Sequence, residues 1–195
     1  MMKRTALALL FSIPVSVSAQ DSSQTLPLLP DRLGPMEVVF WGKGGAMRKL
    51  FDFPLTPEGR ESEMRLRRNM LGLHQLGGFV TLAAMAATMV VGQKVYNGDR
   101  DLRQIHKALA FTTVSAYFST AAFSLFTPPP LIRRNEWSSI STHKMLGTLH
   151  FTGMLAMPVL GTLIREGNTE LRPVHLGVGY ATLAAFGAAM LVITF

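Results

Sequence analysis

Four long apolar segments constrain this chain more than any other feature of its sequence. Residues 69–92, 105–127, 145–164 and 174–195 each reach the length of about 20 apolar residues that a helix needs to cross a bilayer. Lys107 is the only charged residue inside them. With 48% hydrophobic and 16% charged residues, the chain is also too apolar for an ordinary soluble domain. The sequence predicts an all-α membrane protein, folded as an antiparallel bundle of four transmembrane helices.

The first of these helices should begin well before its apolar segment. Thr56 is a capping residue, Pro57 suits the first helical position and Glu58 supplies an acidic first turn. No helix breaker follows before residue 93, so we expect one long helix over 57–93 that protrudes from the bilayer. Residues 57–195 would then form one four-helix transmembrane bundle.

The N-terminus has the features of an export signal. Lys3 and Arg4 precede an apolar run, and Val17-Ser18-Ala19 is an acceptable cleavage sequence. We therefore expect residues 1–19 to be a signal peptide, with residues 20–67 on the periplasmic side of a bacterial inner membrane. Lys and Arg are more frequent in residues 20–67 and 128–144 than on the opposite face, and the positive-inside rule favours the reverse orientation. We base the predicted membrane orientation on the export signal.

Residues 20–56 contain several prolines and glycines, so an irregular conformation is predicted. Aromatic side chains favour the membrane interface, which predicts a segment lying along the membrane surface. A strap that docks a partner protein is the alternative. The residues expected to touch the membrane are Val38, Val39, Phe40, Trp41, Leu50, Phe51 and Phe53.

Four of the five histidines stand at or near the starts of the four apolar segments, at intervals of 32, 37 and 32 residues. A single histidine at a helix end is commonly an ordinary interfacial residue. One at every span favours a function, because ionisable residues are rare in membrane segments. Consecutive helices run in opposite directions, so His74 should face His143 near one membrane surface and His106 should face His175 near the other.

Facing imidazoles in a four-helix bundle can supply the two axial ligands of a haem iron. The positive end of a helix dipole disfavours imidazolium, which keeps such rings neutral and able to bind metal. We therefore predict two haems in the four-helix bundle of residues 57–195, one ligated by His74 and His143 and the other by His106 and His175. Three nearby cations would suit the haem propionates, although they are also ordinary for helix ends: Lys107, Lys144 and Arg172.

Four sequence pieces resemble the cytochrome b-561 family, the four-helix core of transmembrane electron-transfer proteins that hold two b-type haems. They are GLHQLGGF at 72–79, QIHKALAF at 104–111, STHKMLGTL at 141–149 and RPVHLGVGYATL at 172–183. The resemblance covers residues 70–195 and implies the same two ligand pairs.

His150 departs from that pattern. It follows His143 by one heptad, so it lies on nearly the same helix face, about 10 Å deeper. Three roles remain open: a hydrogen-bonded core residue, a residue that contacts a haem edge, or an axial ligand. A second departure concerns the elements around the core. The family's core often occurs together with flanking helices or an extracytoplasmic redox domain, and the resemblance identifies neither in this sequence.

The sequence therefore predicts an integral membrane dihaem cytochrome that carries electrons across the bilayer, as an electron-transfer oxidoreductase. The electron donor and acceptor stay open, with quinol, ascorbate and another redox protein as candidates. The sequence also leaves open whether the protein forms a homodimer. The net charge of +7 is spread over loops, which favours membrane lipid over nucleic acid as a partner. There is no nucleophile and base constellation of a hydrolase.

Two alternatives compete with the cytochrome. A haem-free four-helix scaffold or assembly protein would place the histidines at interfaces for structural reasons. A proton or metal-ion transporter would use them as a relay, but every Asp and Glu lies outside the apolar segments, where a cation transporter usually keeps a carboxylate.

Overall fold

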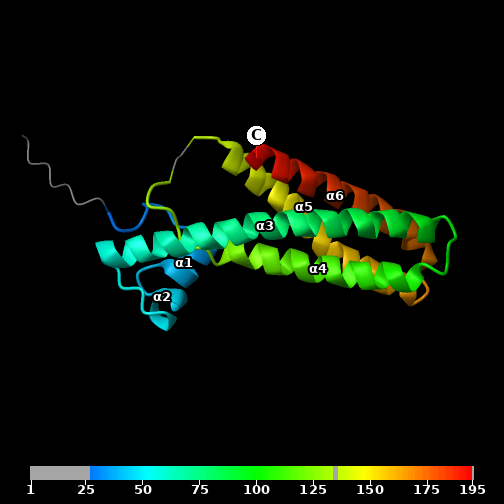
Figure 1. The fold of residues 1–195 in the computed structure, drawn as a ribbon, viewed down its shortest axis with the longest axis horizontal. Helices are drawn as coiled ribbons and strands as arrows, with labels where there is room; N and C mark the ends of the chain where they lie inside the picture. The colour runs from blue at the N-terminus through cyan, green and yellow to red at the C-terminus, as the bar shows by residue number, and fades with distance from the viewer. Residues whose placement is uncertain (1–26, 134–135, 195) are drawn as a thin grey trace, which may run out of the picture.

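The computed structural model describes residues 27–133 and 136–194, and the predicted signal peptide at 1–19 lies outside them. Over the described residues the fold is all-helical (Figure 1). Its elements are α1 (Pro35–Trp41), α2 (Ala46–Leu50), α3 (Pro57–Tyr96), α4 (Arg103–Leu125), α5 (Ser139–Arg165), the 3-10 turn η1 (Thr169–Leu171) and α6 (Arg172–Thr194).

Four of these helices, α3, α4, α5 and α6, are long and apolar enough to cross a membrane. The predicted fold class is therefore confirmed, and the chain is a multi-pass membrane protein. The long first helix begins at Pro57, where the Gly59 N–H donates to the Thr56 hydroxyl at 3.1 Å. It continues to Tyr96, three residues beyond the predicted end.

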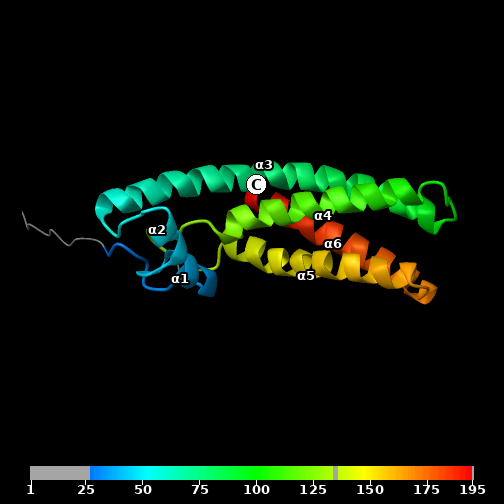
Figure 2. The same ribbon diagram turned by 90° about the horizontal axis from the view of Figure 1, so that it is seen from below.

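The four helices form two antiparallel hairpins, α3 with α4 and α5 with α6, and α3 also packs against α6. The α3–α4 and α5–α6 turns lie at one end of the bundle, while the α4–α5 connection lies at the other end beside α1 and α2 (Figure 2). A buried cluster of Met85, Tyr117, Met154 and Phe186 forms the centre. Large apolar side chains such as Phe111 and Leu149 point outward, as expected for surfaces that face lipid.

The two hairpins are an internal repeat. A spacing of 69 residues separates His74 from His143 and also separates His106 from His175. Because α3 and α5 run in one direction and α4 and α6 in the other, an approximate two-fold axis along the bundle relates the hairpins. Between the two hairpins, six further identities at this spacing are buried or half-buried at both positions within the described residues: Gly78 and Gly147, Met85 and Met154, Gly92 and Gly161, Leu102 and Leu171, Thr113 and Thr182, and Ala116 and Ala185.

The N-terminal segment is more ordered than predicted, because it forms α1 and α2 and packs against the start of α3. The predicted membrane contact of Trp41 is wrong. Its side chain is fully buried, and its indole N–H donates to the carbonyl oxygen of Phe126 at 2.9 Å. Phe40 packs edge-on against that same phenylalanine, with ring centroids 4.8 Å apart. Val38, Val39, Leu50 and Phe51 are exposed.

A buried ion cluster fastens this segment to α3. Glu63 on α3 is fully buried and pairs with both Arg48 of α2 and Arg60, which are also buried. Arg60 also donates to the carbonyl oxygen of Pro129 at 3.1 Å, which joins the cluster to the α4–α5 connection. We call residues 27–56 with this cluster the cap. The cap covers the end of the bundle nearer to His74 and His143.

Candidate functional site

The structure brings the four span histidines together as two ring pairs. His74 on α3 and His143 on α5 have ring centroids 6.2 Å apart, and this is the first pair. His106 on α4 and His175 on α6 have centroids 6.4 Å apart and form the second pair. The partners are those that helix direction predicts. Within each pair, the two rings occupy equivalent positions of the internal repeat.

These separations match the geometry of two imidazoles on opposite sides of one metal atom. A transition metal such as zinc lies about 2.0–2.1 Å from an imidazole nitrogen, so coaxial rings have facing nitrogens about 4 Å apart and centroids about 6 Å apart. The ring planes of the two pairs meet at 88° and 80°. Rings that share an axis can have any angle between their planes. Both pairs therefore fit axial ligation, and ligation itself stays a prediction.

Backbone carbonyls orient the rings of the first pair. The Nδ1–H of His74 donates to the carbonyl oxygen of Thr120 at 3.0 Å. The Nδ1–H of His143 donates to the carbonyl oxygen of Ala189 at 2.9 Å, and this acceptor is the repeat equivalent of the first. A proton on Nδ1 leaves Nε2 with its lone pair, which is the usual arrangement of a metal-binding histidine.

Glycines make room for the rings of the second pair. A Cβ on Gly92 would lie 2.8 Å from Cε1 of His106, and a Cβ on Gly161 would lie 3.6 Å from Cε1 of His175. The buried Nδ1 atoms of both rings have no hydrogen-bond partner within the described residues. Close packing at Gly92 thus helps to place the His106 ring, which also interacts with the backbone of Thr88.

Two other glycines bring the helices of each hairpin close together. A Cβ on Gly77 would lie 2.3 Å from the hydroxyl oxygen of Thr120, and one on Gly153 would lie 2.0 Å from that of Thr182. Such contacts let helix backbones approach in lipid. Because Thr120 is also the acceptor for His74, the close approach of α3 and α4 helps to fix the orientation of the His74 ring.

His150 does not join either pair. Its Nδ1 bonds to the hydroxyl of Tyr117 at 2.7 Å, and its ring packs on Phe186 with centroids 4.9 Å apart. Of the three roles left open by the sequence, a hydrogen-bonded core residue agrees with these contacts. The sequence reasoning missed Tyr117, because an aromatic residue at helical spacing gives no signal of its own.

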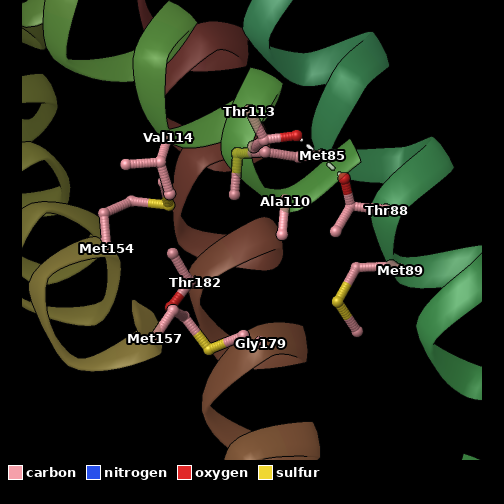
Figure 3. A pocket seen from close by; sticks show the side chains of 10 residues that line it. All are labelled: Met85, Thr88, Met89, Ala110, Thr113, Val114, Met154, Met157, Gly179 and Thr182. Atoms are coloured by element: carbon pink, nitrogen blue, oxygen red, sulfur yellow. Dashed lines mark hydrogen bonds between the residues drawn. The ribbon is translucent and has the colours of Figure 1, made fainter. Parts of the chain in front are cut away.

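A small cavity of about 50 Å³ lies between the four helices, on the inner side of the second pair (Figure 3). Ala110 and Gly179, each four residues after a histidine of that pair, are part of its wall. The remaining wall is methionine, threonine and valine, and Figure 3 shows the Thr88–Thr113 hydrogen bond of 2.8 Å beside it. Four methionines line it: Met85, Met89, Met154 and Met157.

The three cations predicted to pair with haem propionates have no position that distinguishes a haem-binding role from that of ordinary residues at helix ends. Lys107 and Lys144 are exposed and Arg172 is half-buried, each near the start of its helix. Their role near a haem stays a prediction. The sequence reasoning also missed the buried Arg48, Arg60 and Glu63 cluster, whose residues read as part of a charged protruding helix and a surface segment.

Within the described residues, no group of three or more His, Cys, Asp or Glu side chains is placed to hold a metal ion. Each ring pair offers two nitrogens. Comparison with known proteins finds no match: no family model, no curated protein and no solved structure is significantly similar to the chain.

Proposed function

We propose that the protein is an integral membrane cytochrome that holds two b-type haems and carries single electrons across the bilayer. The observation that supports this most is the pair of ring separations, 6.2 and 6.4 Å, in one bundle. A haem brings four iron ligands of its own, so two imidazoles per site are the number that the protein must supply. Such a haem would supply one-electron chemistry, and the protein would supply ligands, position and an apolar surround.

The positions of the pairs support transfer across the membrane. His74 and Gly92, which contacts His106, are 18 residues apart on α3, a helix length of about 27 Å. The hydrocarbon core of a bilayer is about 30 Å thick. The two sites would thus lie near opposite surfaces, and with the predicted export signal the first site and the cap would face the periplasm.

The orientation of the rings supports binding of iron rather than of protons. In the first pair both Nδ1 protons are engaged by carbonyl oxygens, so each Nε2 is free to donate its lone pair. The lipid surroundings disfavour a charged imidazolium at these positions. The rings would therefore act as fixed ligands.

Absorption spectroscopy of the detergent-purified protein tests the proposal. After expression with ample haem, we expect a Soret band and, on reduction with dithionite, the alpha band of a bis-imidazole b-type haem. A haem-free scaffold gives neither band, and that result would refute the proposed function.

Single substitutions then test the pairing. His74→Ala or His143→Ala should remove one haem, and His106→Ala or His175→Ala should remove the other. His150→Ala should keep two haems, because its Nδ1 is bonded to Tyr117. Loss of a haem from His150→Ala, with both haems retained in His143→Ala, would show that the pairing is wrong.

A further inference from the structure

The internal repeat makes the two hairpins a reference for each other, and buried residues differ between them at several positions, such as Thr120 in the first hairpin and Ala189 in the second. His150 occupies the position that Thr81 has in the first hairpin, and Tyr117 occupies the position that Phe186 has in the second. All four residues lie in one layer of the bundle. Tyr117 and His150, which both differ from their counterparts in the repeat, are bonded to each other at 2.7 Å.

We propose that the Tyr117–His150 pair makes the two haem sites unequal, by giving the site at His74 and His143 the higher reduction potential. This inference rests on the proposed function. Tyr117 and His150 would be positioning residues that touch neither iron nor axial nitrogen. With the second site lower in potential, electrons would flow toward the capped end of the bundle.

The hydrogen bond fixes which nitrogen of His150 carries the proton. The Tyr117 side chain is 2% exposed, and its phenolic O–H needs an acceptor once it is out of water. His150 Nδ1 is the acceptor within reach. A neutral imidazole that accepts at Nδ1 carries its proton on Nε2. The pair therefore holds an N–H group in a defined place inside the bundle.

That N–H group lies on the side of the first ring pair. The Nε2 atom of His150 is 4.0 Å from the Cβ position of Gly147, which is one turn nearer to His143 along α5. Tyr117 lies one turn from Thr120, whose carbonyl oxygen holds His74.

The inner side of the second pair has a different character. There the wall consists of the four methionines, with Ala110, Gly179, Val114 and three threonines, around the small cavity (Figure 3). The Thr88 hydroxyl bonds to Thr113 and to the Ala84 carbonyl, and the Thr182 hydroxyl donates to the Val178 carbonyl. These hydroxyls are satisfied within the helices, so no imidazole or phenol dipole is directed at the second site from this wall.

The sign of the effect follows from charge. Reduction adds one negative charge to a haem site, and a nearby N–H dipole with its positive end toward that site stabilises the reduced form. Hydrogen-bond donors and local polarity are established means of tuning haem potentials. In an apolar interior such a dipole acts more strongly than in water. The first site should accordingly be easier to reduce than the second.

The test is a spectroelectrochemical titration of the full-length protein in detergent, with substitutions taken from the repeat itself. Tyr117→Phe and His150→Thr each install the residue that the other hairpin uses. Either should lower the reduced-to-oxidised ratio of the first haem about tenfold at a fixed potential, which is about 59 mV for a one-electron couple. The second haem should be unchanged. His74→Ala, which leaves the second haem alone, assigns the two transitions.

Thr112→Val is the matched control, because this exposed hydroxyl on α4 donates only to the Ala108 carbonyl of its own helix. It should leave both potentials unchanged. Wild-type protein without haem would refute the proposed function, and this inference with it. Two haems in wild type, Tyr117→Phe and His150→Thr with the same two potentials would refute this inference and leave the function standing. A fall in the second potential instead of the first would also overturn it.

Discussion

At the scale of single residues, Glu63 shows how a charge is accommodated inside this protein. It is fully buried and is shared by Arg48 and Arg60. Both guanidinium groups also donate to backbone carbonyls, Arg48 within the cap and Arg60 in the α4–α5 connection. A buried ion pair adds little net stability compared with apolar residues. Removal of one member is costly, because the other charges are left without a partner.

We therefore predict that Glu63→Ala destabilises the protein by about 3–5 kcal/mol, since two buried guanidinium groups lose their carboxylate. Denaturant unfolding in detergent, followed by circular dichroism, measures the change. Glu61→Ala is the matched control, because its pair with Arg65 is exposed and contributes little. Equal effects from the two substitutions would contradict a structural role for the buried cluster.

At the scale of helices, glycines decide where the rings can lie. Gly92 on α3 leaves the space that the His106 ring of α4 occupies, whereas a Cβ on Gly161 would make an ordinary van der Waals contact with His175 in the other hairpin. These glycines are equivalent in the repeat. The close packing of α3 and α4 thus also helps to position the His106 ring.

A methyl group at Gly92 should displace the ring of His106, because its Cβ would lie 2.8 Å from Cε1. We expect Gly92→Ala to lower the haem content of the second site and to leave the first site loaded. Quantitative haem spectra, with His74→Ala as the background that isolates the second site, measure this. Gly177→Ala has open space around its Cβ and should have no effect. A fully loaded second site in Gly92→Ala would show that the glycine is not needed for ring placement.

Several features of the helices and of their arrangement could be predicted from the sequence. Span number, the start of α3 at Pro57 and the facing of His74 with His143 follow from hydropathy, capping and helix direction alone. The burial of Trp41 could not be predicted, since an aromatic residue in a proline-rich segment suits a membrane surface equally well. The Tyr117–His150 bond joins α4 to α5, and sequence spacing within one helix carries no information about such a contact.

At the scale of the whole molecule, an approximate two-fold axis places both ring pairs along the bundle, and two features depart from it. The cap covers only the first end, and the Tyr117–His150 bond has no counterpart at the equivalent positions Phe186 and Thr81. In our proposal this bond gives the site beneath the cap the higher reduction potential.

The central claim is that each ring pair binds one haem, and the molar ratio of haem to protein tests it most directly. We expect two haems per chain in the wild type, one in His143→Ala, one in His106→Ala and none in the double substitution. A wild-type ratio of one, or a haem that survives the double substitution, would contradict the account.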